Sequence, residues 1–269
     1  MLTTILTTIL TLPGPATAQG ALPPAPSSER PRDPFVFRCV LDGRVRMVTL
    51  ALHDELWAAW DAQTCALYKT WKGGVKFDGA VYTTVHGPTP TTRGEDYQQG
   101  LEGGAWFAYQ GNAPVEARAR WRGYRLEQGA CVLQYDIELA DGRAVRVEEC
   151  PEFATPERLF TPEQMEDWGL EPGLPGLVRR YHAPDVPAGL VVGVLVRTDA
   201  PRGRFIDAGG AAQERLVDLK DAKGQVVATE IHSLVWLDAA RKRNSLTQFF
   251  DPKGPPPAAT APGGSGGGR

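Results

Sequence analysis

Residues 35–52 read FVFRCVLDGRVRMVTLAL, with an apolar, valine-rich run on each side of Asp42-Gly43. An Asp-Gly pair between two such runs is a strong signal for a β-hairpin with a tight turn. Three more pairs of apolar runs flank turn sequences, namely Asp61-Ala62-Gln63-Thr64, Asp141-Gly142 and Asp221-Ala222-Lys223-Gly224. Further hairpins are expected for Leu56–Trp60 with Cys65–Trp71, for Cys131–Leu139 with Ala144–Cys150, and for Glu214–Leu219 with Gln225–His232. Hairpins this frequent predict antiparallel pairing through most of the chain.

Little helix is expected between these strands. The run Thr161-Pro162-Glu163-Gln164-Met165 offers a threonine cap and a proline in the first helical position, which predicts one short helix. Leu190–Val196 is a short apolar run, typical of a strand buried on both faces. We therefore predict an all-β fold: an antiparallel β-sandwich, galactose-mutarotase-like or jelly-roll-like, with at most one or two short helices.

The N-terminus has the features of an export signal. Residues 1–28 contain no Asp, Glu, Lys, Arg or His, and Leu2–Leu12 is a short apolar run. Ala16-Thr17-Ala18 then fits the small-residue rule for cleavage, so residues 1–18 are predicted to be a signal peptide. A disordered apolar leader is the alternative. The apolar run is far shorter than the roughly 20 residues that a membrane-spanning helix needs, so we expect no membrane span and a periplasmic or extracellular location.

Two low-complexity stretches flank the expected sandwich. Residues 19–34 are rich in Pro, Ala and Ser, which is typical of an extended tether. Residues 251–269 are almost entirely Pro, Gly, Ala, Ser and Thr, and such a segment cannot bury enough apolar surface to fold. The folded domain is therefore expected over residues 35–250, followed by a disordered linker to further domains of a longer protein.

The bulk composition limits the classes of partner. Hydrophobic residues make up 42% and charged residues 23% of the 269 residues, as in ordinary folded proteins. The net charge is −3 and the pI is about 5.9. Basic residues such as Arg118 and Arg120 alternate with acidic ones such as Glu116 and Glu127, so no basic stripe is available for phosphates. Nucleic-acid binding is not expected.

The four cysteines are Cys39, Cys65, Cys131 and Cys150, and no two of them form a CxxC pair. This spacing excludes the usual structural zinc sites and c-type haem attachment. In an oxidising compartment we expect two disulfides. A four-residue loop around Asp141-Gly142 places Cys131 directly opposite Cys150, whereas a two-residue loop leaves them diagonal. We predict a Cys131–Cys150 bridge with the longer loop and, by elimination, a Cys39–Cys65 bridge. Four free buried thiols are the alternative.

The sequence shows no complete catalytic or metal-binding set. The single GxSxG match falls within residues 263–267 of the low-complexity tail, where no strand precedes it. The four histidines are scattered without metal-ligand spacing, and neighbouring acids such as Glu148-Glu149 point to opposite faces of a strand. We therefore predict no catalytic residues and no metal site.

Aromatic residues are concentrated in one window of the chain. Five of the seven tryptophans lie there, namely Trp57, Trp60, Trp71, Trp106 and Trp121. Most of these rings are expected in the sandwich core. The segments 71–74 and 82–88 are exceptions, because their glycines and proline predict loops, where binding residues tend to lie. The candidate ligand-binding residues are Trp71, Lys72, Asp78, Tyr82 and His86.

Several runs of this sequence are similar to one known module. They are residues 33–38, 46–52, 56–74 and 77–88, with 121–126 and 147–152 as later matches. Together they resemble the N-terminal module of large secreted c-type cytochromes, which accompanies dehydrogenase domains like the quinone-dependent, sorbosone-type sugar enzymes. The resemblance implies that haem c or quinone belongs to C-terminal partner domains and that this chain carries no cofactor. It transfers no catalytic residues to this chain.

These observations favour a non-catalytic exported module that binds carbohydrate or docks the partner domains of a sugar-oxidising assembly. A carbohydrate-active enzyme (hydrolase, lyase or epimerase), using carboxylates near the loops of residues 71–86, is the first alternative. A purely structural spacer is the second. The sequence identifies neither the ligand nor the oligomeric state.

Overall fold

The computed structural model describes residues 35–77, 79, 81–83, 85, 87–100, 106–197, 203–206, 213–220, 223 and 225–254. Residues 203–206, 213–220, 227, 228 and 230–232 are described by their backbone alone. The predicted signal peptide (residues 1–18), the tether (residues 19–34) and nearly all of the predicted linker (residues 255–269) lie outside the described residues and stay predictions.

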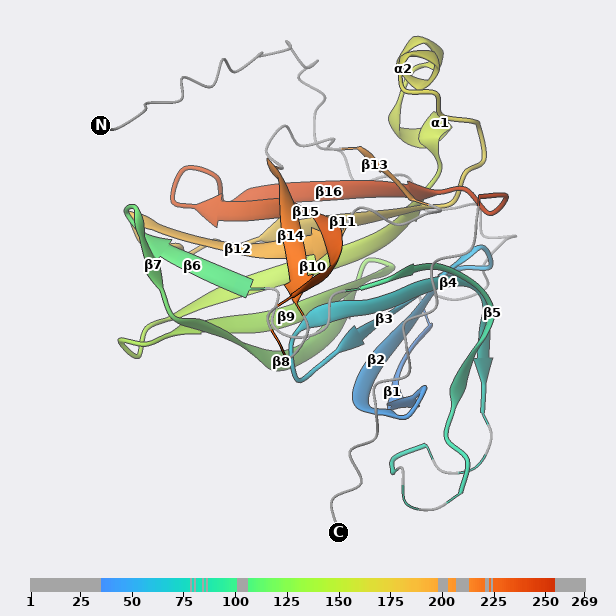
Figure 1. Ribbon diagram of the computed structural model, residues 1–269, viewed down its shortest axis with the longest axis horizontal. Coiled ribbons are helices and arrows are strands. Elements are labelled where there is room, and N and C mark those ends of the chain that lie inside the picture. The colour runs from blue at the N-terminus through green and yellow to red at the C-terminus, as the bar shows by residue number, and fades with distance from the viewer. Residues whose placement is uncertain are drawn as a thin grey trace. The chain divides into compact units, whose positions relative to one another are not determined.

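The described strands form three sheets, and every strand pair in them is antiparallel (Figure 1). Sheet A follows the chain order: β1 (Phe35–Leu41), β2 (Arg44–His53), β3 (Leu56–Asp61), β4 (Ala66–Lys76) and β5 (Thr91–Gln99). Sheet B has the order β14 (Gln213–Lys220), β15 (Val226–Asp238), β12 (Leu190–Arg197), β6 (Trp106–Gln110) and β7 (Ala113–Val115). Sheet C has the order β13 (Gly203–Ile206), β16 (Arg243–Phe250), β11 (Gly176–His182), β10 (Ala144–Ala154), β9 (Ala130–Leu139) and β8 (Ala117–Glu127).

The predicted all-β antiparallel sandwich is confirmed. All four predicted hairpins form, as β1–β2, β3–β4, β9–β10 and β14–β15. Its finer assignment to a galactose-mutarotase-like or jelly-roll-like architecture stays a prediction.

The described residues contain two short helices, α1 (Pro156–Leu159) and α2 (Pro162–Asp167). Helix α2 begins where the sequence predicts it, because Thr161 and Gln164 cap each other's backbone N–H groups. No helix of the described ranges is both long enough and apolar enough to cross a membrane.

One main core joins the three sheets. Trp60 from sheet A, Tyr135 from sheet C and Val192 from sheet B all belong to it and are fully buried. Alternation along each strand supplies these inward side chains. Strand β12 corrects the expectation of burial on both faces: Val192 and Val194 are buried, whereas Val191 and Leu195 are half-buried.

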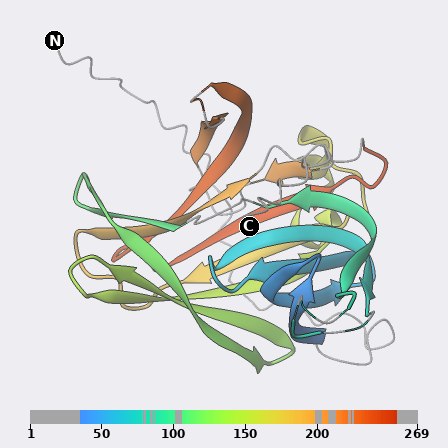
Figure 2. The ribbon, with the colours of Figure 1, turned by 60° about the horizontal axis from the view of Figure 1, so that its bottom comes forward.

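Sheet A also buries side chains on the face opposite to the main core. We call this group the outer cluster; it consists of Cys39, Leu41, Met47, Ala59 and Trp71, with Phe37, Trp57, Tyr68, Val75 and Val81 packed against it. Sheet A, coloured blue to teal in Figure 2, curls strongly. Its concave and convex faces can therefore each pack against other side chains. Two backbone hydrogen bonds hold the β4–β5 connection against β1 and the turn after it, from Val40 N to Val81 O (2.8 Å) and from Asp42 N to Pro90 O (2.9 Å).

The β9–β10 hairpin contradicts the predicted Cys131–Cys150 disulfide. Leu139 N donates to Arg143 O, and Glu138 pairs with Ala144, so the loop has three residues rather than four. A one-residue change of register turns a side chain to the other face of the sheet. Cys131 consequently lies in the main core, and Cys150 lies on the opposite face beside Glu152. Both are free thiols.

The Cys39–Cys65 bridge is also absent. Cys39 belongs to the outer cluster and Cys65 to the main core, on opposite faces of sheet A, and both thiols are free. The alternative of four free, largely buried thiols describes this structure.

Candidate functional site

The predicted loop at residues 71–74 is part of strand β4, and this corrects the expected role of Trp71. Its side chain is fully buried in the outer cluster, and its indole Nε1 donates to Gly74 O (2.8 Å). The glycines do not form a loop. They let the paired strands β4 and β5 approach each other closely. Gly73 pairs with Gly94, and a Cβ on Gly73 would stand 2.2 Å from Arg93 O. Trp71 therefore has no face to offer a ligand.

The other four predicted binding residues differ in their exposure and in whether the structure describes them. Lys72 is half-exposed, and its Nζ lies 2.6 Å from Oε2 of Glu55. Tyr82 is 85% exposed, the largest exposure among the described large hydrophobic side chains. Asp78 and His86 lie outside the described residues. Tyr82 is the most exposed of the three candidates that the structure describes.

We group four aromatic residues near the outer side of sheet A under the name aromatic patch: Phe35, Phe37, Phe77 and Tyr82. The ring centroids of Phe35 and Phe37 lie 5.3 Å apart, and those of Phe37 and Phe77 lie 5.1 Å apart. Phe35 and Phe77 are each about half exposed. Tyr82 follows Val81, which packs against the same outer cluster as Phe37. Phe35, Phe37 and Phe77 thus form a row of neighbouring rings beside the outer cluster, and Tyr82 joins the group through its place in the chain next to Val81.

Sequence reasoning missed Phe35 and Phe37 as surface residues. Both were part of the run that predicted strand β1, and their spacing of two puts them on one face of that strand. Strand β1 is an edge strand of sheet A, with β2 as its ladder partner. Alternating aromatics on an edge strand were the signal that could have found them.

A polar cluster lies at the end of sheet A where the β1–β2 turn meets β5. Asp42 accepts hydrogen bonds from the Thr92 backbone N–H (2.8 Å) and from the Tyr68 hydroxyl (3.1 Å). The Lys69 ammonium stands between two carboxylates, 2.9 Å from Asp96 and 3.7 Å from Asp42. Burial, followed by the negative charge of Asp42, raises the pKa of Tyr68 above its usual value.

This polar cluster contains two neighbouring carboxyl groups, as a glycoside hydrolase site does, but an ammonium group lies between them. Paired carboxyls act on a glycosidic bond when substrate and water fit between them. Here the nearly buried Lys69 ammonium lies between Asp42 and Asp96 and bonds both. The arrangement holds the turn against β5, and its chemistry is that of a structural ion cluster.

A second ionic cluster is buried in the main core. Glu149 accepts from Arg179 Nε (2.6 Å), from Trp60 Nε1 (3.3 Å) and from the Tyr135 hydroxyl (2.8 Å). Burial and the charge of Glu149 raise the pKa of Tyr135 well above its usual value. Burial opposes the charge of Arg179, but the carboxylate of Glu149 outweighs it and raises the pKa of the guanidinium. The Arg179 guanidinium is therefore charged at neutral pH.

The described residues indicate neither a metal-ion site nor a nucleophilic thiol. No group of three or more His, Cys, Asp and Glu side chains there could hold a metal ion. Burial raises the pKa of the Cys39 thiol to about 11 and the pKa of the Cys65, Cys131 and Cys150 thiols to about 12. The thiolate is the nucleophile, so raised thiol pKa values do not favour a reactive cysteine at neutral pH.

Comparison with known proteins adds no family to this picture. No protein-family model matches the chain, and no curated protein matches it either.

Proposed function

We propose that this chain is a non-catalytic, exported β-sandwich module that binds carbohydrate through the aromatic patch. In this proposal it serves a sugar-oxidising assembly in which haem c or quinone is carried by C-terminal partner domains. The module itself needs no cofactor. Its location is periplasmic or extracellular.

The aromatic patch is the observation that carries the proposal. Exposed apolar patches on soluble domains mark interaction sites more often than single exposed side chains do. The C–H faces of sugar rings pack against aromatic rings, and a tyrosine adds a hydroxyl that can hydrogen-bond a sugar. Tyr82 offers such a ring to solvent, and Phe35 and Phe77 add two half-exposed rings on the outer side of sheet A.

The angles between the ring planes indicate which kind of carbohydrate the aromatic patch would bind. The planes of Phe35 and Phe37 differ by 41°, and those of Phe37 and Phe77 differ by 56°. Rings tilted this far do not form a flat platform, so a crystalline polysaccharide surface is a poor match. A soluble oligosaccharide or a branched polysaccharide, which can bend around the patch, fits this surface better.

Two features support a non-catalytic role. In the described part of sheet A, Lys69 fills the space between the carboxylates of Asp42 and Asp96. The carboxylate of Glu149 is fully buried in the main core and accepts hydrogen bonds from three donors. The carboxylates of Asp42 and Asp96 are thus engaged by Lys69, and Glu149 is enclosed in the core.

A binding screen with a hydrolysis assay tests the proposal. The purified chain would be run in native gels that contain soluble dextran, xylan, mixed-linkage glucan or galactomannan, and reducing sugar would be measured in parallel. We expect retarded migration in at least one gel and no release of reducing sugar. Release of sugar would favour the enzyme. Unchanged migration in every gel would contradict carbohydrate binding and leave docking of partner domains or a structural spacer.

A further inference from the structure

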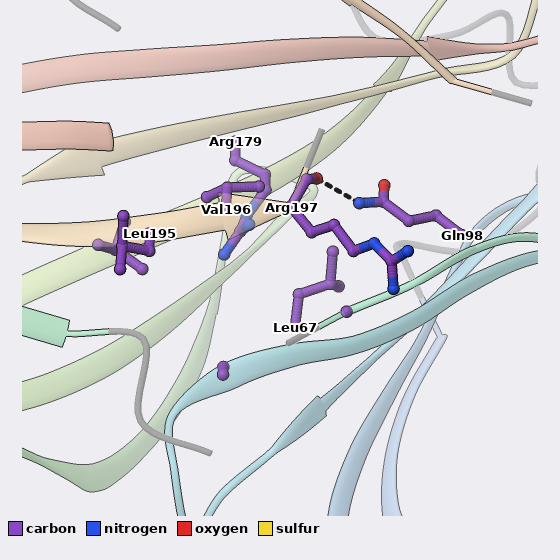
Figure 3. A pocket seen from close by; sticks show the side chains of 9 residues that line it. Leu67, Gln98, Arg179, Leu195, Val196 and Arg197 are labelled. Carbon is purple, nitrogen blue, oxygen red and sulfur yellow. Dashed lines mark hydrogen bonds between the residues drawn. The ribbon is translucent and has the colours of Figure 1, made fainter. Parts of the chain in front are cut away.

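The pocket where the three sheets meet is too small for an organic ligand. Its lining includes Leu67 and Gln98 of sheet A and Arg197 of sheet B. In this conformation it has room for about one water molecule. Figure 3 shows one contact of this lining, in which the Gln98 amide donates to the backbone carbonyl of Arg197. A larger ligand would therefore bind on the outside of the sheets.

Strand β8 forms one edge of sheet C, and β9 is its one ladder partner among the described strands (Figure 1). An edge strand presents unpaired backbone N–H and C=O groups along its outer side. A β-bulge between Trp121 and Gly123 divides β8, so residues 117–121 form a regular stretch of edge before it. An extended segment of another protein can add to such a stretch as a further strand.

Arginines occupy the outer face of this stretch. Arg118 and Arg120 are both exposed, and their spacing of two places them on the same face of β8. Nη1 of Arg120 lies 3.2 Å from Oε1 of Glu138 on β9. No ion pair of the Arg118 side chain is found among the described residues. The charge of Arg118 is therefore available to a partner.

The neighbouring carboxylate of Asp136 does not neutralise this charge, because it is shared by two other arginines. Its oxygens lie 3.2 Å from Nε of Arg122 and 2.5 Å from Nε of Arg146. Both of these guanidinium groups are about two-fifths exposed. Four arginines and two carboxylates thus leave an excess of two positive charges near this edge. The edge is suited to a negatively charged partner.

The inner face of the same stretch is apolar. Ala119 is buried in the main core, and Ala117 and Trp121 are partly buried against it. A strand added beside β8 would continue the alternation of the sheet. Its outward side chains would lie beside the arginines, and its inward side chains would lie beside Ala119 and Trp121. Acidic residues suit the first set of positions and apolar residues suit the second.

We propose that the edge at residues 117–121 docks an extended peptide segment of a partner protein in which acidic and apolar residues alternate. Opposite charges on neighbouring strands attract, whereas like charges repel. A second copy of this chain is a poor occupant for that reason, because antiparallel pairing centred on Ala119 would place Arg118 opposite Arg120. The proposal does not depend on carbohydrate binding by the aromatic patch.

Fluorescence anisotropy of a labelled model peptide with the whole chain tests the docking. The probe is a capped peptide of alternating glutamate and valine, about seven residues long, which matches the length of an ordinary strand. The same peptide with lysine in place of glutamate is the control. We expect the glutamate peptide to bind and the lysine peptide not to bind. Equal binding of the two peptides, or no binding of the glutamate peptide, would contradict the proposal.

Hydrogen–deuterium exchange distinguishes strand addition from simple attraction between charges. Strand addition gives the outer backbone N–H groups of β8 new acceptors, so the amides of residues 117–121 should exchange more slowly when the glutamate peptide is bound. Binding without slower exchange in these residues would overturn the pairing. Binding of polygalacturonate in place of the peptide would identify a site for an acidic polysaccharide and would also overturn it.

A charge reversal tests the part played by the arginines. Arg118→Glu changes an exposed side chain, so the fold should be kept, and we expect it to weaken binding of the glutamate peptide about threefold to tenfold. Arg93→Glu is the matched control, because Arg93 is an exposed arginine on β5, an edge strand of sheet A. It should bind the peptide as the wild type does. Equal affinity of the two variants would contradict docking at β8.

Discussion

Glu149 and Arg179 form an ion pair inside the main core, with 2.6 Å between Oε1 and Nε. They lie on neighbouring strands: Glu149 is paired with Tyr181, and Arg179 is paired with Pro151, two residues along the same face. Both side chains are almost completely excluded from solvent. The pair ties strands β10 and β11 together inside the main core.

Removing one member of this pair should destabilise the fold strongly. Glu149→Gln keeps the shape of the side chain but leaves the buried charge of Arg179 without a counter-ion. Breaking a buried pair in this way costs about 3–5 kcal/mol. The free energy of unfolding in urea measures the loss.

The matched control for that variant is Glu138→Gln. Glu138 pairs with Arg120 at 3.2 Å, and both side chains are well exposed. Exposed pairs contribute about 0–1 kcal/mol. If the two variants lose the same amount of stability, the buried pair does not have the role described.

The four cysteines should be free and slow to react in the native protein. Their thiols are shielded, and burial holds their pKa at about 11 for Cys39 and about 12 for the other three. We expect slow labelling by a thiol reagent in native buffer and labelling of all four thiols after unfolding without reductant. Labelling of two or fewer thiols in the unfolded protein would show that a disulfide forms and would contradict the four free thiols.

Gly193 is required by the packing of sheet B. A Cβ at this position would stand 2.2 Å from the Phe107 ring and 2.5 Å from Val235 O, and the backbone oxygen cannot move aside cheaply. Gly193→Ala should therefore destabilise the protein by about 1–3 kcal/mol, the usual range for overpacking. Thermal unfolding measures the change.

Gly74→Ala is the control for this glycine. A Cβ at Gly74 would meet the Trp57 ring at 3.9 Å, an ordinary contact. Its melting temperature should stay near that of the wild type. A Gly193→Ala protein as stable as Gly74→Ala would mean that the strands of sheet B are further apart than described.

Glu148 should make stability depend on acid pH. Its hydrogen bonds with Arg125, at 2.5 and 3.2 Å, lower the pKa of the carboxyl from 4.5, with a further bond from Gln134; the His182 side chain also faces it. Because the folded-state pKa is lowered, the stabilisation is complete above about pH 4.5 and is lost as the pH falls through the folded-state value.

The test of this pH dependence is Glu148→Gln, compared with the wild type by urea unfolding. We expect a difference of less than about 1 kcal/mol near neutral pH, since the pair is partly exposed, and a smaller difference at about pH 3. A difference that grows as the pH falls would contradict the assignment.

The sequence predicted the strands better than their exact pairing. Asp42-Gly43 and the apolar runs around it predicted the β1–β2 hairpin, because turn residues and strand residues have distinct local preferences. The prediction of the disulfides was wrong because it depended on the number of residues in the loop after Leu139. A single residue there changes which face Cys131 and Cys150 occupy, and local sequence does not fix that number.

The candidate site was predictable in part. The exposure of Tyr82 follows from its place in a segment rich in turn formers. The burial of Trp71 could not be predicted, because the curl of sheet A creates a second apolar layer, and this depends on the distant contacts of Val81 and Pro90. The ion pair of Glu149 and Arg179 joins residues 30 positions apart, and no local pattern connects them.

The central claim is that the aromatic patch is the binding face of this module. The most direct test is calorimetric titration of the soluble polysaccharide that retards the protein most, comparing Tyr82→Ala with Tyr124→Ala, an exposed tyrosine on β8. We predict that Tyr82→Ala weakens binding about tenfold or more, equivalent to about 1.4 kcal/mol, and that Tyr124→Ala binds as the wild type does. Equal affinity of both variants and the wild type would contradict the claim.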